Sequence, residues 1–264
     1  PGGPPSGHER HSRTSTDAGI RHGVHAGASA LRTNEFLPNS GKMGRRALVG
    51  LQLLLLVAAL TGAVLSSRAE DWQPIGLVVL LAIVTIVSDV MPIQTRHLRL
   101  SGGFISVVLA MALLGPAPAV AVALSTIIVD TAIRPLPPIL LLSNLAAFAT
   151  YPLVGGLLMR WLNVDAMDNL SFALAVFAVF GVTNLLNFLL IVGPRKVTHG
   201  MPLLQQFRTL FVPMLPSEAL ACVLTVVIAV TYRELGLLAL VALIGVLFLF
   251  QVLTRELLLS QERA

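Results

Sequence analysis

A series of long apolar runs constrains this chain more than any other feature. A helix needs about 20 apolar residues to cross the roughly 30 Å hydrocarbon core of a bilayer. The runs fall at about 47–66, 74–91, 103–115, 117–133, 137–159, 170–192, 212–231 and 235–254. The pattern therefore predicts an all-α fold, a polytopic transmembrane helix bundle of about eight hydrophobic segments.

The composition excludes a soluble domain. Of the 264 residues, 55% are hydrophobic and 12% are charged, and the mean hydropathy is +0.83. Soluble domains are about 45–50% apolar and about 25% charged. We attribute the net charge of +5 to Lys and Arg at membrane edges rather than to a nucleic-acid groove. The lone Cys222 allows no internal disulfide and no cysteine-based metal site. We expect the lipid bilayer as partner, no nucleic acid and no cofactor.

The third run, 103–115, is short for a membrane span. Its 13 residues reach only about 20 Å as a helix. A tight break, Gly115-Pro116-Ala117-Pro118, joins it to the fourth run. Two forms fit this pattern: two spans, the first extended back through Leu98, or a hairpin that enters the membrane and returns.

The loop charges predict the orientation. With the N-terminus inside, eleven cationic residues fall on one face of the bundle, namely Lys42, Arg45, Arg46, Arg96, Arg99, Arg134, Arg195, Lys196, Arg208, Arg255 and Arg263. The other face receives three, which are Arg68, Arg160 and Arg233. Cytoplasmic loops are enriched in Lys and Arg. The bias predicts an inner (plasma) membrane protein with both ends of the bundle in the cytoplasm.

The first 42 residues differ from the rest of the chain. They are polar, contain only nine apolar residues and show no apolar period, so we expect a disordered tail. Met43 is followed by Gly44-Arg45-Arg46 and an apolar run, as in a natural start. We therefore expect residues 1–42 to be an extension outside the native coding sequence, followed by the bundle, 43–254.

Three acidic residues, Asp89, Asp130 and Glu218, lie within or near the runs, and we place all three close to the cytoplasmic boundary. A charge at mid-bilayer costs several kcal/mol, so such residues usually face protein, water or a partner. Two interpretations remain. One is interfacial pairing and capping, with Asp130 one turn from Arg134 and Ser217 capping the seventh helix. The other is a ligand or proton site.

Three amides also fall in the cytoplasmic half: Asn144, and the Asn184 and Asn187 pair that shares a face at i and i+3 spacing. Asn in membrane helices often bonds helices together. The alternative is a shallow cavity open to the cytoplasm, for an unidentified small ligand. Its candidate lining residues are Asn144, Asn184, Asn187, Asp130, Glu218 and Asp89. Separately, Gly155-Gly156, Gly181 and Ala219–Ala221 suit close helix packing.

The carboxyl end is the most informative segment. From Leu235 to Ala264 there are 30 residues without proline, enough for a helix of about 45 Å. The membrane uses about two-thirds of that length, and residues 255–264 would emerge as the start of a cytoplasmic signalling helix. No glycine or proline stops this helix, so we expect further chain to follow it, and a homodimer could form through it.

The bundle resembles the N-terminal membrane region of a group of bacterial signalling proteins. The resemblance rests on Ser101-Gly102-Gly103-Phe104 with the following VVLAMALLGPAPAVAVALSTIIVD, on the Asn144 helix, on TNLLNFLLI and on the exit LTRELLLSQERA. In that group a cytoplasmic HD-type (often HD-GYP) metal-dependent phosphohydrolase or a diguanylate cyclase domain follows. The resemblance implies a membrane sensor or anchor module in cyclic-dinucleotide signalling. No catalytic residue carries over, and we expect this chain itself not to be an enzyme.

One rival function comes from a different class. The break at Gly115 and the amides within the runs also suit a small-molecule transporter, such as the substrate-binding subunit of a vitamin uptake system, because transporters use interrupted helices at binding sites. A scaffold that only localises its output domain is a third interpretation.

Overall fold

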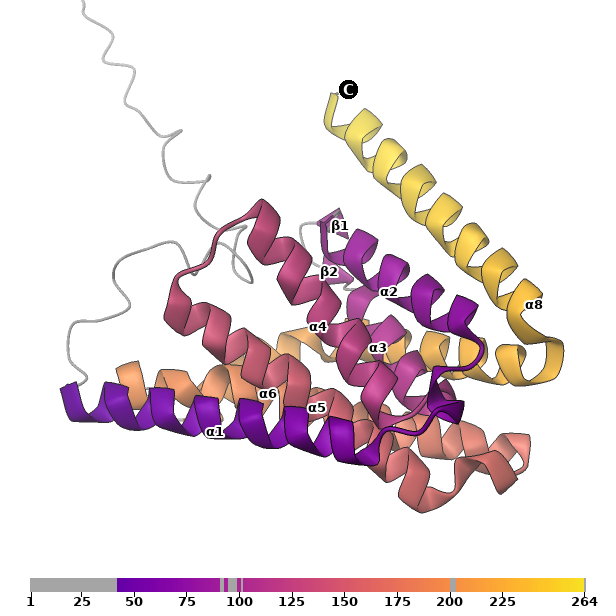
Figure 1. Ribbon diagram of the computed structural model, residues 1–264. Helices are drawn as coiled ribbons and strands as arrows, with labels where there is room; N and C mark the ends of the chain where they lie inside the picture. Colours follow the sequence, from indigo (N-terminus) through magenta and orange to yellow (C-terminus); the bar gives the residue numbers. More distant parts are fainter. Residues whose placement is uncertain (1–41, 91–92, 95–98, 101, 200–202, 264) are drawn as a thin grey trace, which may run out of the picture. The chain divides into compact units, whose positions relative to one another are not determined.

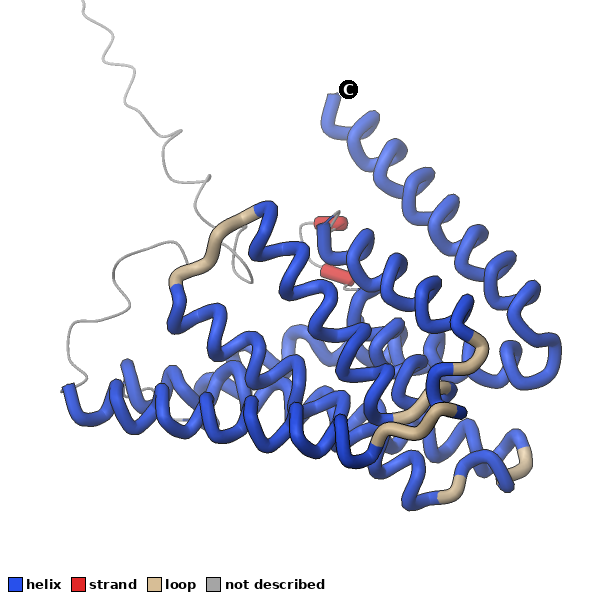
Figure 2. Tube along the Cα trace, in the orientation of Figure 1, coloured by secondary structure: helices blue, strands red, loops and turns tan. Residues whose placement is uncertain are grey.

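The computed structural model describes residues 42–90, 93–94, 99–100, 102–199 and 203–263. In this part the regular structure is helical except for two strands of two residues each, β1 (Ile93–Gln94) and β2 (Arg99–Leu100), which pair antiparallel (Figures 1 and 2). The all-α class is confirmed. The expected tail, 1–42, lies outside the described residues except for Lys42, so the expectations for it stay predictions.

The elements follow one another in a simple order along the chain. The α-helices of the described part are α1 (Lys42–Ser66), α2 (Ile75–Val90), α3 (Gly102–Leu113), α4 (Pro116–Ile133), α5 (Pro138–Leu162), α6 (Asn169–His199), α7 (Leu203–Gln206) and α8 (Leu215–Arg263). Short turns of other helix types complete them: 3-10 turns η2 (Glu70–Trp72), η3 (Val164–Ala166) and η5 (Val212–Met214), and a π turn η4 (Phe207–Phe211).

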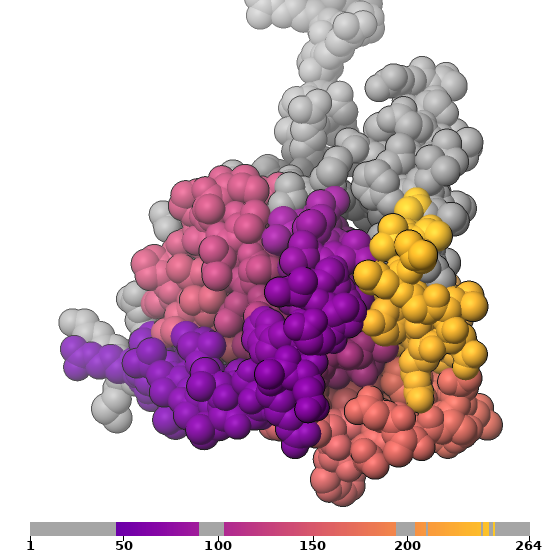
Figure 3. Space-filling view, turned by 45° about the vertical axis from the view of Figure 1, so that its right-hand side comes forward, coloured from indigo at the N-terminus to yellow at the C-terminus, as the bar shows by residue number. Residues whose placement is uncertain are grey.

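The helices form a transmembrane bundle. Within the described residues, five helical stretches are long and apolar enough to cross a membrane: Arg46–Ser66, Pro116–Ile133, Pro138–Leu162, Asn169–Gly193 and Leu204–Leu238. Two shorter apolar helices, Ile75–Asp89 and Gly103–Leu113, accompany them. Helix α1 lies on the outside of the bundle (Figure 3), and most of its exposed side chains, among them Leu54, Val64 and Leu65, are apolar, as suits a lipid-facing helix.

Helix α8 turns sharply at Gly236. This residue has φ 76° and ψ −166°, a conformation that is essentially restricted to glycine, while the residues on both sides are helical. The helix axis changes direction there (Figure 1). The first part of α8, 215–235, and the second part, 237–263, therefore correspond to the seventh and eighth predicted segments.

The α3–α4 pair runs from one end of the bundle to the other. At the end where α2 finishes, a Cβ added to Gly103 would lie 2.7 Å from Oδ1 of Asp89. At the opposite end, a Cβ on Gly115 would lie 3.2 Å from Nη2 of Arg160. We call these the Asp89 end and the Arg160 end. In the structure each of the two helices connects both ends. The extension expected through Leu98 falls outside the described residues, and whether the pair crosses the membrane stays a prediction.

Helix α3 can be short because protein surrounds it. Val107, Val108 and Ala110 are fully buried, and α2, α4, α5 and α8 all pack against it. Twelve residues of helix span only about 18 Å, too little for a lipid-facing helix. Because neighbouring helices rather than lipid cover its ends, α3 does not need the full hydrocarbon thickness.

Two adjacent glycines allow the helices to approach closely. A Cβ added to Gly156 on α5 would lie 2.4 Å from the Cα of Pro116, the first residue of α4, and one on Gly155 would meet Sδ of Met111 at 2.2 Å. Real Cβ atoms do not approach other atoms this closely. Gly156 therefore needs to be glycine because it meets backbone, whereas at Gly155 the side chain of Met111 would have to move. The packing predicted for Gly155-Gly156 is confirmed. The same prediction is wrong for Gly181, where an added Cβ would have no neighbour within 4 Å and the residue is exposed.

We predict that Gly156→Ala destabilises the bundle by about 1–3 kcal/mol, because the backbone of Pro116 cannot yield as a flexible side chain would. The matched control is Gly181→Ala, another helical glycine, which should be neutral or slightly stabilising. The free energy of unfolding in mixed detergent micelles, followed by circular dichroism, measures both. Equal stability of the two variants would contradict the packing described for α4 and α5.

Candidate functional site

Glu218 lies deeper than the sequence suggested. The expected segment began near 212, but the helical stretch that contains it begins at Leu203 and continues through η4 and η5 into α8. Glu218 is fourteen residues into the apolar helical stretch Leu204–Leu238. The expected cap is also absent, because Ser217 lies within the helical run and its Oγ donates to the carbonyl of Met214 at 2.8 Å.

Glu218 pairs with one of the predicted amides. Nδ2 of Asn184 on α6 donates to Oε2 of Glu218 on α8 at 3.0 Å. Asn184 lies nine residues, about 14 Å, before the end of its own span, Asn169–Gly193, so the pair lies near mid-membrane depth. Asn187, one turn further along α6, has a buried Oδ1 without a hydrogen-bond partner in the described part of the chain.

Asp89 belongs to a different contact. Its Oδ2 accepts a hydrogen bond from Oγ1 of Thr126 at 3.2 Å, which links α2 to α4. The carboxylate also lies against Gly103, in the first turn of α3, where the helix dipole favours negative charge. Asp89 on α2 therefore bonds to α4 and lies against the first turn of α3 at its end of the bundle.

Asp130 and Asn144 do not join these pairs. In the described residues neither one makes a hydrogen bond or ion pair with the other four candidates. The pairing of Asp130 with Arg134 is not formed: α4 ends at Ile133, and only the backbone N–H of Arg134 contacts Asp130, at its carbonyl. Beside Asn144, Ser143 accepts a hydrogen bond from Nε2 of Gln52 on α1. The single polar layer is thus divided into separate contacts.

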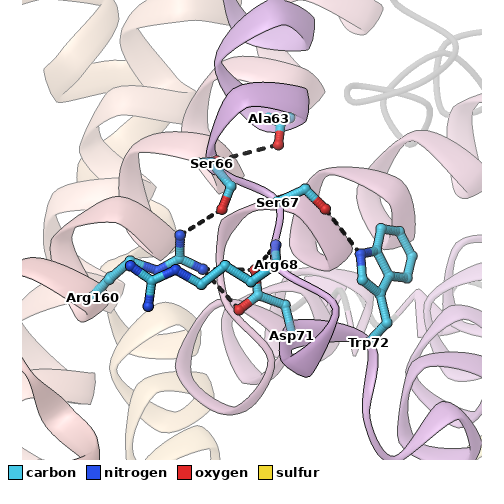
Figure 4. A network of polar contacts seen from close by, with 7 residues as sticks. All are labelled: Ala63, Ser66, Ser67, Arg68, Asp71, Trp72 and Arg160. Atoms are coloured by element: carbon cyan, nitrogen blue, oxygen red, sulfur yellow. Dashed lines mark hydrogen bonds and ion pairs between the residues drawn. The ribbon is translucent and has the colours of Figure 1, made fainter.

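The strongest polar network lies at the other end, around Arg160 in the last turn of α5 (Figure 4). Its Nη2 donates to both carboxylate oxygens of Asp71, at 2.8 Å and 2.6 Å, and its Nη1 donates to the carbonyl of Ser66 at 2.5 Å. The side chain of Asp71 is only 10% exposed. Within the described residues this is the only salt bridge. It ties the α1–α2 loop to the end of α5.

The α1–α2 loop is closed by further contacts of its own. The backbone N–H of Arg68 donates to Oδ2 of Asp71 at 3.0 Å, and Nε1 of Trp72 donates to Oγ of Ser67 at 3.1 Å (Figure 4). Gly115, with φ 104°, turns the chain from α3 to α4 directly beside the Arg160–Asp71 pair. One ion pair thereby brings together the α1–α2 loop, the α3–α4 turn and α5.

A polar hollow of about 430 Å³ adjoins this ion pair. Segments from the α1–α2 loop, the C-terminal end of α3, the end of α5 and η3 form its wall, and its lining is mostly polar. The charged and amide residues that line it are Arg68, Glu70, Asp71, Arg160, Asn163 and Asp165. In the described part of the chain no group of three or more His, Cys, Asp or Glu residues is arranged to hold a metal ion.

Sequence reasoning missed both Gln52 and the Arg160 network. Gln52 is the only amide of its apolar run, and this is the signal that the sequence offers. In the structure Gln52 is 4% exposed. The loop charges identify Arg160 only as one of the three cations on the face of the bundle that has fewer cations. A cation that breaks the charge bias next to a membrane span indicates a local acidic partner. The acidic residues on that face include Glu70, Asp71, Asp165 and Asp168, and the sequence does not single out Asp71 among them.

Comparison of the chain with protein-family models, curated proteins and solved structures finds no match. The fold and the polar contacts described above are therefore the basis for any functional assignment.

We predict that Asp71→Asn and Arg160→Lys each destabilise the bundle by about 2 kcal/mol, the size expected for hydrogen bonds to a charged group. Lys should not replace Arg160, because a single ammonium group cannot bond the Asp71 carboxylate and the Ser66 carbonyl in the same fork. A double-mutant cycle on the free energy of unfolding checks this: the double variant should lose clearly less than the sum of the single losses. Strictly additive losses would mean that the pair contributes nothing.

Proposed function

We propose that the chain is a membrane-embedded sensor or anchor module of a bacterial signal-transduction protein, situated in the inner (plasma) membrane. The observation that supports this most is the construction of α8. Its first part is bonded into the bundle at two levels. Its second part changes direction at Gly236, packs against the bundle through the buried Leu240 and continues as a long helix.

The first part of α8 is bonded near mid-membrane depth and at the Arg160 end. Near mid-membrane depth, Glu218 accepts from Asn184 of α6. At the Arg160 end, the guanidinium of Arg233 lies 4.4 Å from the centre of the Phe172 ring, and its Nη2 donates to the carbonyl of Met167 at 3.0 Å. A cation over an aromatic ring contributes about 0.5–2 kcal/mol. These contacts make the first part of α8 respond to the position of α6.

The second part of α8 is longer than a membrane requires. Its 27 residues, 237–263, give a helix of about 40 Å, against about 30 Å of hydrocarbon. A helix that is anchored through one turn and extends beyond the bilayer can transmit a displacement of its anchor to whatever it contacts. We assign this part as the output helix, with both ends of the bundle in the cytoplasm.

The family resemblance extends this proposal to an output domain. An HD-type phosphohydrolase in cyclic-dinucleotide signalling would follow the output helix, and the bundle would sense or anchor rather than catalyse. The output helix also offers a place for a homodimer contact. The transporter alternative gains no support at Gly115, because the break there is a turn between two antiparallel helices at the end of the bundle, not an interruption within a span.

The reading frame beyond the codon for Ala264 tests this proposal directly. We expect the frame to continue from the output helix into an HD-type or cyclase domain. A stop codon directly after Ala264 would overturn the sensor assignment in favour of a transporter or a scaffold.

Where the frame continues, the activity of the full protein in native membranes tests the coupling. Arg233→Gln removes the cation over Phe172 and should change output activity severalfold at unchanged protein level. Arg134→Gln, the same change at an exposed residue near the Asp89 end, is the matched control and should leave activity as it is. Equal activity of both variants would show that α8 does not transmit through this anchor.

A further inference from the structure

The charged side chains that line the polar hollow at the Arg160 end carry a net charge of −1. Asp71 and Arg160 neutralise each other, which leaves Arg68 as the one remaining cation of the lining against Glu70 and Asp165. Arg68, Glu70 and Asp165 are exposed and in no ion pair within the described residues. The charged side chains of the wall thus favour a positive guest by one unit.

Backbone carbonyls add to this preference. Five consecutive residues at the end of α3, Met111 to Gly115, line the hollow, yet the lining is mostly polar. The last carbonyls of a helix lack intrahelical partners. Here the N–H groups of Leu114 and Gly115 both donate to the carbonyl of Ala110. Pro116 has no N–H and cannot donate to the carbonyl of Ala112. The C-terminal end of α3, with backbone carbonyls that lack intrahelical partners, therefore faces the hollow beside the first turn of α4.

The guest must donate several hydrogen bonds and carry a positive charge. A protonated primary amine has both properties, since an ammonium group presents three N–H donors. A coordinated metal ion does not fit as well, because the described residues hold no cluster of three or more suitable side-chain ligands. The hollow, at about 430 Å³, has room for an organic molecule that carries such a group.

We propose that this hollow is a binding site for a small organic ammonium compound, either a simple amine or an amino acid whose carboxylate would contact Arg68. This proposal names an input for the sensor and rests on the proposed function only for that role. Binding itself does not depend on it.

The 3-10 turn η3 connects the hollow to α8. Its residues Val164 and Asp165, which follow Asn163, belong to the wall of the hollow, and Arg233 of α8 donates to the carbonyls of Val164 and Met167. Occupancy would thus reach α8 through one turn.

The chain carries its own reporters for this site. Its two tryptophans, Trp72 and Trp161, each follow directly on a residue of the Asp71–Arg160 pair. Intrinsic fluorescence of the full chain in lipid nanodiscs at constant ionic strength should therefore change on binding. The probes are putrescine as an amine and L-lysine as an amino acid, with succinate and Mg²⁺ as controls for an anion and an inorganic cation.

We expect a saturable fluorescence change with putrescine or lysine below about 10 mM, the range a small polar ligand reaches. Response to both probes identifies the ammonium group as the recognised chemistry, and response to lysine alone identifies the amino acid. The double variant Glu70→Gln, Asp165→Asn should weaken binding at least about tenfold. The matched control is Asp168→Asn, which removes one nearby charge outside the lining and keeps an oxygen that accepts from the N–H of Leu170.

Three outcomes would overturn the proposal: no saturable change with either amine, an equal response to Mg²⁺, or a response that persists unchanged in the double variant. Loss of binding in the double variant with unchanged circular dichroism and unfolding separates recognition from misfolding. A stop codon after Ala264 would remove the sensor role and leave this binding result standing, so the two proposals fail separately.

Discussion

The bundle depends on how closely α5 packs against the α3–α4 turn. At Gly156 the backbone of α5 nearly touches that of Pro116, and at Gly155 it meets Met111, so α3 is held inside the protein. In lipid there is no hydrophobic force between helices, and association relies on such close packing together with hydrogen bonds between helices. The Arg160–Asp71 pair then lies over the turn and joins it to the α1–α2 loop.

This arrangement separates two kinds of polar contact. Near mid-membrane depth and towards the Asp89 end, single hydrogen bonds such as Asn184–Glu218 and Thr126–Asp89 join pairs of helices. At the Arg160 end, a branched ion pair fixes the loops and borders a polar hollow. The first kind fixes the relative positions of helices, and the second fixes one end of the bundle. The first part of α8 takes part in the first kind through Glu218, and at the Arg160 end its Arg233 donates to the carbonyl of Met167.

Much of the fold could be predicted from hydropathy, because lipid requires long apolar helices whatever their partners are. The runs at 137–159 and 170–192 became α5 and α6 for this reason. The site could not be predicted in the same way. The depth of Glu218 depends on where its helix begins, and Pro213 and Pro216 obscured a start at Leu203. The partner of Arg160 lies 89 residues away in the chain, a distance that no periodicity reveals.

The most direct test of this account asks which side of the membrane the α3–α4 turn reaches. In a Cys222→Ser background, single variants Leu113→Cys at the hollow, Ala166→Cys in η3 and Pro135→Cys in the α4–α5 loop are treated with a membrane-impermeant thiol reagent in vesicles of one orientation. We expect Leu113→Cys and Ala166→Cys to react from one side and Pro135→Cys only from the other. Reaction of Leu113→Cys from the same side as Pro135→Cys would contradict it, because α3 and α4 would then enter the membrane and return without crossing.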